Sequence, residues 1–229
     1  MKNRNNIQIF LIIFLSFLFT LISQAAPSTP SEIINESIDV LKEMSYAKDS
    51  EAFGALLKEA KGIAIFPAIL KAGWGIGGQY GKGIIFRKNK NLGLWYGPAF
   101  IKIKSISIGP QIGVQSVALV LVIYNERGME GFMENNFTLG GNAGIAAGPI
   151  GRSLSADTDY KFKASIYSYS ISKGAYIGAS FQGSTIEEDK NLNESFYKKV
   201  ITNNDILKNK ITINPAVIRL LLLVKKLIK

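Results

Sequence analysis

The sequence predicts an α+β fold built on a strongly curled, mainly antiparallel and glycine-rich β-sheet that approaches a barrel. Helices precede this sheet, one short helix is inserted in it, and an amphipathic helix follows it. Apolar residues recur at helical spacing over residues 33–44, and the period changes to two from residue 62 onward. Short polar turns separate several of the later strands, and strands linked in this way pair antiparallel.

The first 25 residues have the layout of a secretory signal peptide. Lys2 and Arg4 precede an apolar run over residues 9–22, and the small residues Ser23 and Ala25 follow it. That run has 14 residues, whereas a membrane-spanning helix needs about 20. We expect cleavage after residue 25, with retention as an anchor as the alternative. The protein would then be exported, periplasmic or secreted, and peripherally associated with a membrane.

The rest of the chain is expected to form one domain over residues 26–204 and a basic amphipathic tail over residues 205–229. Thr29 and Glu32 have the spacing of a capping box around Pro30, which predicts a helix start. A second helix is predicted over residues 51–61, ended by Gly62. A short buried strand over residues 62–67 should end at Pro67.

The predicted strands continue with a hairpin, in which residues 83–86 and 92–96 flank a polar turn at 87–91. Residues 100–108 alternate, but the isoleucines change face, so a bulge or bend is expected near Ser105. The remaining predicted elements are a long central strand over 111–124, a short helix over 126–135, and strands over 160–170 and 175–182 joined by a turn at 173–174.

The stretch KAGWGIGGQYGKG, residues 71–83, matches the glycine spacing of a dinucleotide-binding loop. That loop requires a following helix and an acidic residue about 20 positions on. Here a strand follows, and no acid occurs between Glu59 and Glu126. Lys82 is followed by Gly83 and not by Ser or Thr, which excludes a P-loop. We therefore expect a strand whose glycines permit tight curling or close backbone approach.

The composition argues against an enzyme and against a bound cofactor or metal. The chain has no histidine and no cysteine, which removes the imidazole base, the thiol nucleophile and thiolate metal sites. Carboxylates cluster at residues 157–159 and 187–189, and their expected role is solvated loop charge. A calcium site at 187–189 would match no known loop spacing. Ser168, Ser170 and Ser172 lack a base and are expected to be ordinary strand residues.

Positive charge is concentrated in two segments. Residues 60–125 contain eight basic residues and no acid, and residues 198–229 contain eight basic residues and one acid. Such clusters favour anionic partners, and export argues against nucleic acid. The candidate lipid-binding residues of the first segment, expected to form one patch, are Arg87, Lys88, Lys90, Lys102 and Lys104. Those of the tail, on one third of a helix, are Arg219, Lys225, Lys226 and Lys229.

Two interpretations of the tail helix stay open. Asn214 and Pro215 predict its start. It could dock on the sheet with its lysines in water, or lie in the headgroup layer of a membrane as an interfacial helix. In the second case it should be largely disordered in buffer, because about 15 residues are marginal without packing.

Several motifs in order resemble the SYLF domain over residues 35–200. They are AKGIAIFP at 60–67, GWGIGGQYGKG at 73–83, GPQIGVQ at 109–115, the glycine-rich stretch 139–151, YSISKG at 169–174 and the segment 189–197. The resemblance implies a lipid-binding module; eukaryotic members bind phosphoinositides, and fungal members bind actin. Two departures are Ile171, where the family often has arginine, and Lys198, where it often has glycine.

These observations together predict an exported, non-enzymatic lipid-binding module that associates with anionic or phosphoinositide-containing membranes through charge and shallow apolar insertion. The alternative is a protein-interaction module that binds an envelope component or actin. An unrecognised hydrolase is a more distant third.

Overall fold

The computed structural model describes residues 29–46, 50–89, 91–134, 136–141, 144–148, 164–172, 175–177 and 181–228. The predicted signal peptide, the turn at 173–174, the carboxylates at 157–159, and the candidate residues Lys90 and Lys229 lie outside this set. The described helices are α2 (Pro30–Tyr46), α3 (Ser50–Glu59), α4 (Glu126–Met133), α5 (Lys190–Tyr197), α6 (Asn203–Asn209) and α7 (Pro215–Leu227). The strands are β1 (Gly62–Asn89), β2 (Leu94–Ile123), β3 (Asn136–Thr138), β4 (Ile145–Ala147), β5 (Ile166–Ser172), β6 (Ala175–Ile177) and β7 (Thr185–Glu188).

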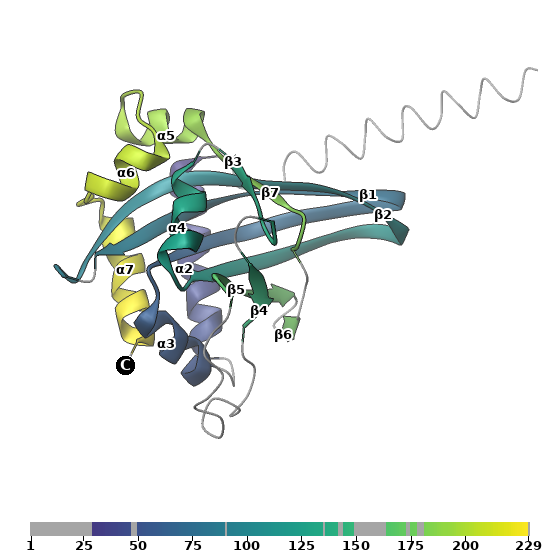
Figure 1. Ribbon diagram of the computed structural model, residues 1–229, viewed down its shortest axis with the longest axis horizontal. Coiled ribbons are helices and arrows are strands. Elements are labelled where there is room, and N and C mark those ends of the chain that lie inside the picture. The colour runs from purple at the N-terminus through teal and green to yellow at the C-terminus, as the bar shows by residue number, and fades with distance from the viewer. Residues whose placement is uncertain are drawn as a thin grey trace, which may run out of the picture.

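A long hairpin of β1 and β2 forms the body of the sheet, which curls into a half-barrel (Figure 1). β2 is central, because it pairs with β1, β5 and β7, and β4 with β5 is the parallel pair among otherwise antiparallel ones. This confirms the predicted α+β class and the curled, mainly antiparallel sheet. The predicted short helix is α4.

The sheet is covered on both faces, so it contributes to two hydrophobic cores. Alternate residues of one strand enter different cores: Ile63 and Ile65 pack with α2, α3 and α7, whereas Ala64 and Phe66 pack with α4, α6 and β3. The helices α2, α3 and α7 thus lie on one face (Figure 1). This arrangement explains the nearly continuous apolar runs of the central strands.

The strand begins at Gly62 as predicted, but the predicted ends of the preceding helix and of the strand itself are both wrong. α3 ends at Glu59, and Gly62 begins β1 instead of capping a helix. Pro67 does not end the strand, because β1 continues for 28 residues through the glycine-rich stretch. Phe66 lies opposite Leu119 and Ile69 opposite Val117, so a bulge accommodates the proline, which has no N–H to donate.

The bend predicted near Ser105 is also wrong. The pairing runs without a shift from Lys82 opposite Lys102 to Ile76 opposite Ile108, and Ser105 lies opposite Gln79 within it. Ile106 lies on the opposite face of the strand from the buried Ile101 and Ile103, and its side chain is 84% exposed. The regular alternation of the strand therefore accounts for its position without a bend. The irregularity lies beyond Ile108, between Ile76 and Trp74.

The capping prediction at the start of α2 is confirmed. The Glu32 N–H donates to Thr29 Oγ1 at 3.3 Å, and the Thr29 N–H donates to Glu32 Oε2 at 3.1 Å. α7 begins as predicted, with Asn214 Oδ1 accepting from the N–H of Ala216 at 2.9 Å and of Val217 at 3.3 Å.

The tail adopts the docked arrangement of the two alternatives. Val217, Leu220 and Val224 are completely buried in the core with α2 and α3. The boundary predicted at residue 205 falls inside α6, whose Ile206 and Leu207 are completely buried in the other core. The described residues of the tail therefore belong to the packed body.

Both departures from the SYLF pattern have a structural consequence. Lys198 has a φ of 56°, in the left-handed region that glycine adopts without strain. Ile171 is 6% exposed and packs in the core with α2, α3 and α7.

Candidate functional site

The turn end of the β1–β2 hairpin holds a basic hollow, which we call the hairpin pocket. Four cations from three parts of the chain line it: Lys61 before β1, Arg87 and Lys88 at the end of β1, and Lys208 on α6. Its volume is about 290 Å³, and its other lining residues are Asn89, Asn91, Tyr96 and Glu126. The prediction included Arg87 and Lys88 but missed Lys61 and Lys208.

Glu126 is the acid of this pocket, and it bridges two of the cations. Its Oε1 lies 3.0 Å from Lys61 Nζ, and its Oε2 lies 3.3 Å from Arg87 Nη2. Burial alone would raise the pKa of Glu126, but the hydrogen bond and charge of Lys61 and the charge of Arg87 outweigh it and lower the pKa. Lys88 Nζ donates to the Lys58 carbonyl oxygen at 2.9 Å.

The other predicted cations of the central segment lie elsewhere on the sheet. Lys102 faces Lys82 across the strands, and Lys82 is six residues from Lys88, which is about 20 Å of extended chain. Lys104 forms an ion pair with Glu187 of β7. The expected single patch is therefore divided into two groups along the hairpin.

The carboxylates at 187–189 have structural partners. Besides the ion pair of Glu187, Asp189 Oδ1 caps α5 by accepting from the Leu192 N–H at 3.2 Å. Glu188 Oε1 accepts from Asn193 Nδ2 at 3.2 Å and from the Asn203 N–H at 2.9 Å. Burial raises the pKa of the neighbouring Tyr80, and the charges of Asp189 and Glu187 raise it further.

A groove between α2 and α7, the α2–α7 groove, holds two of the predicted tail cations. It has a volume of about 520 Å³ and is lined by Asn35, Ile38, Asp39, Lys42, Arg219, Leu222, Leu223 and Lys226. Leu222 is 60% exposed, and the cations Arg219 and Lys226 lie at the rim with exposed side chains. Lys42 pairs with Asp39 at 2.9 Å. Lys225 is also exposed on α7.

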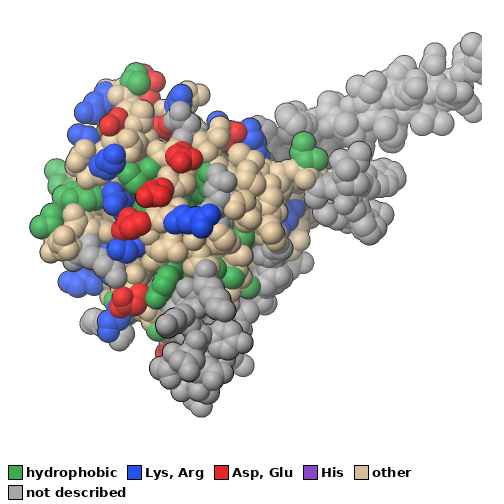
Figure 2. Space-filling model, in the orientation of Figure 1, with side chains coloured by type: hydrophobic (Ala, Val, Ile, Leu, Met, Phe, Trp, Pro, Cys, Tyr) green, Lys and Arg blue, Asp and Glu red, His purple; other side chains and the backbone are tan. Residues whose placement is uncertain are grey.

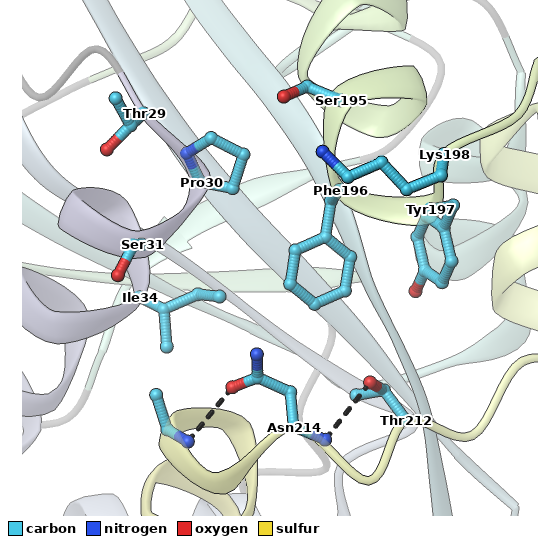
Figure 3. Close-up of a pocket in the computed structure, with 11 residues that line it drawn as sticks. Thr29, Pro30, Ser31, Ile34, Ser195, Phe196, Tyr197, Lys198, Thr212 and Asn214 are labelled. Carbon is cyan, nitrogen blue, oxygen red and sulfur yellow. Dashed lines mark hydrogen bonds between the residues drawn. The ribbon is translucent and has the colours of Figure 1, made fainter.

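A further hollow of about 510 Å³ lies where the starts of α2 and α7 meet the end of α5 (Figure 3). The Phe196 ring points between Ile34 and Asn214, and Tyr197 donates its hydroxyl hydrogen to the Pro98 carbonyl oxygen at 2.9 Å. Burial raises the pKa of Tyr197. The helix caps already bind first-turn N–H groups here, and Ser31 and Ser195 have no imidazole partner in a chain without histidine. The serines of this hollow therefore have no imidazole base.

Exposed aliphatic side chains gather near the hairpin turn. Leu92 and Leu94 are 62% and 40% exposed, and Ile211 and Ile213 are 55% and 87% exposed. The segments that carry the two pairs are joined by a hydrogen bond, in which the Gly97 N–H donates to the Lys210 carbonyl oxygen at 2.8 Å. Figure 2 shows hydrophobic side chains with Lys and Arg around them at the end where Figure 1 places this turn and α7.

Within the described ranges, no group of three or more acidic side chains could hold a metal ion. None of the helices described is both long enough and apolar enough to cross a membrane.

Comparison with known proteins finds one family model and several relatives that match this chain. A family model described as "Ysc84: Las17-binding protein actin regulator" matches residues 104–227. Protein YSC84 of Saccharomyces cerevisiae is 35% identical over 182 residues, covering 75% of this chain and 38% of that protein. LAS seventeen-binding protein 3 of the same yeast is 36% identical over 183 residues, covering 76% and 39%.

An animal relative shows a similar likeness. SH3 domain-containing YSC84-like protein 1 of Homo sapiens is 35% identical over 153 residues, covering 66% of this chain and 44% of that protein. The chain thus spans about two fifths of the length of the curated relatives it matches.

Proposed function

Because this chain belongs to the Ysc84 (SYLF) family, we propose that it is a non-enzymatic protein-interaction module that binds an acidic partner along the α2–α7 groove. The names of its relatives specify Las17 binding and actin regulation. Filamentous actin is accordingly the first partner to test. The absence of histidine and cysteine from the whole chain supports a binding role over a catalytic one.

The observation that carries this proposal is the chemistry of the groove. Its floor is apolar, with Ile38 and Leu223, and Leu222 leaves much of its surface exposed. Arg219 and Lys226 add positive charge at the rim, while the charge of Lys42 is balanced by Asp39. Protein interfaces combine an apolar centre with a polar rim, and an amphipathic helix binds such a groove through its apolar face. A rim of net positive charge selects a partner with acidic flanks.

Replacing Arg219 and Lys226 together by glutamine is expected to weaken cosedimentation with actin filaments about three- to ten-fold. Exposed charges at an interface rim act on association and on its salt dependence. The response of binding to added salt should also become shallower. Dissociation constants measured at two salt concentrations test both expectations.

The matched control replaces Lys190 and Lys199, which are exposed on and after α5, by glutamine. It removes the same net charge but leaves the groove intact, so its binding should stay within two-fold of wild type, about 0.4 kcal/mol. An equal loss in both double variants would show that binding follows net charge, which contradicts a groove-specific interface.

A second candidate function, association with an anionic membrane, is favoured by the exposed aliphatic side chains near the hairpin turn. Leu92 follows Asn91, which lines the hairpin pocket together with Lys208, and Ile213 follows Lys210 by three residues. Peripheral membrane proteins combine shallow apolar insertion with attraction to anionic headgroups. This second candidate function includes the two predictions of export and of a phosphoinositide-containing target membrane.

Replacing Leu92 and Ile213 together by serine should lower binding to phosphatidylglycerol vesicles about thirty-fold, because each inserted side chain contributes about 1 kcal/mol, which makes about 2 kcal/mol for the pair. The control is Ile106→Ser, which removes an equally exposed isoleucine at a distance from the turn. Vesicle flotation measures all three proteins. Equal binding by the double variant and wild type would exclude insertion at this end.

A further inference from the structure

We propose that the hairpin pocket binds a compact phosphate group, a phosphomonoester or a polyphosphate, and that the Glu126 carboxylate is an internal competitor for that group. This site is separate from the α2–α7 groove, with which it shares no lining residue. It therefore stands whether or not the protein-interaction function is correct.

The first support is the convergence of cations on one concave surface. Lys61, Arg87 and Lys88 meet Lys208, which is more than a hundred residues away in the chain. With Glu126 as the acid among the lining residues, the pocket has a net formal charge of +3. Like charges brought together in this way repel one another, and a multivalent anion would relieve that repulsion.

The second support is the size and donor chemistry of the hollow. At about 290 Å³, it lies at the lower end of ligand pockets, which begin near about 300 Å³. A guanidinium supplies two parallel N–H donors to phosphate oxygens, and ammonium groups supply point charges. Tyr96 can add its hydroxyl hydrogen, because that oxygen already accepts from Asn89 Nδ2 at 3.1 Å. A small, highly charged group suits this arrangement better than an extended acidic peptide.

The third support is the position of Glu126. Its two oxygens contact Lys61 and Arg87, which is the bridging position that two oxygens of a phosphate would occupy. The side chain is 51% exposed, so it can turn into solvent when an anion enters. The carboxylate thus holds the two cations in place in the unliganded protein and must be displaced for tight binding.

Isothermal titration of the full chain with pyrophosphate and with inositol hexakisphosphate tests the site. Saturable binding is expected, weakened about five-fold by Lys208→Gln, since each nearby cation contributes about that factor. Glu126→Gln should tighten binding by a similar factor, because it removes the competing charge and keeps the side-chain shape. Lys199→Gln, outside the pocket, should change neither ligand's affinity.

A tightened affinity in Glu126→Gln is a result that misfolding cannot produce, so the test does not depend on the weakened variant alone. A circular dichroism melt of each variant accompanies the titrations. Absence of saturable binding by both anions and by vesicles, or an equal loss in Lys199→Gln and Lys208→Gln, would overturn the proposal.

A comparison of two kinds of vesicle at equal surface charge identifies the source of the phosphate. One kind carries phosphatidic acid, which is a phosphomonoester, and the other carries phosphatidylglycerol, which is a phosphodiester. Phosphatidic acid binding that inositol hexakisphosphate competes away and that Lys208→Gln weakens assigns the pocket to a lipid headgroup. Binding of the soluble anions without such a preference assigns it to a free phosphate ligand. Both results support the proposed chemistry.

Discussion

Replacing Val224 by aspartate is expected to leave the protein unfolded, whereas Leu222→Asp on the same helix should leave it folded. Val224 is completely buried, and Leu222 is 60% exposed. A charge at position 224 would lie without a partner in the core formed by α2, α3 and α7. The cost exceeds about 4 kcal/mol, a large part of the 5–15 kcal/mol by which domains are stable.

Urea unfolding followed by far-ultraviolet circular dichroism measures the difference. The same reasoning predicts that removal of residues 215–229 abolishes folding, because α7 covers one face of the sheet and Val217 and Leu220 are completely buried. A folded Val224→Asp protein with near-native stability would show that α7 is dispensable and would restore the interpretation of the tail as a separate segment.

Replacing Gly83 by alanine is expected to cost about 3 kcal/mol of the free energy of unfolding, in the range typical of overpacked sites. A Cβ atom at this position would lie 2.4 Å from the Ile65 carbonyl oxygen and 2.6 Å from the Phe66 ring. Backbone atoms cannot move aside as a flexible side chain can, so the curled strand itself must shift. Gly83 is thus required where one part of β1 approaches another.

Gly78 provides the matched control in the same glycine-rich stretch. A Cβ atom there would lie 3.6 Å from the Ser105 carbonyl oxygen, which is an ordinary contact. Gly78→Ala should therefore be neutral or stabilising by about 0.5 kcal/mol, because alanine reduces the freedom of the unfolded chain. Equal destabilisation by both substitutions would indicate a general dependence on glycine and would contradict the close-approach explanation.

The parts of the fold that local chemistry specifies were predictable from the sequence. The pair Thr29 and Glu32 and the pair Asn214 and Pro215 each fix a helix start through contacts three or fewer residues apart. The glycines of residues 71–83 were correctly assigned to a strand. A nucleotide-binding loop would require a helix after them, and the residues that follow are typical of a strand. The length of β1 was not predicted, because Pro67 and the glycines are normally strand-ending signals and only pairing with β2 overrides them.

The candidate site was less predictable, since it depends on tertiary convergence. Arg87 and Lys88 were signalled by the acid-free central segment, and Lys61 lies in that same segment. Lys208 reaches the pocket only because α6 packs beside β2, which no spacing in the sequence reveals. The register of the hairpin separates Lys102 from Arg87, although both belong to the same basic segment.

Hydrogen exchange of the protein with and without saturating actin filaments tests the central claim, that a partner binds along the α2–α7 groove, most directly. The account predicts slower backbone exchange over residues 35–42 and 219–226, with unchanged exchange in β3 and β7, which do not line the groove. Slowing in β3 and β7 with no change in α2 and α7, under conditions where filaments are bound, would contradict it.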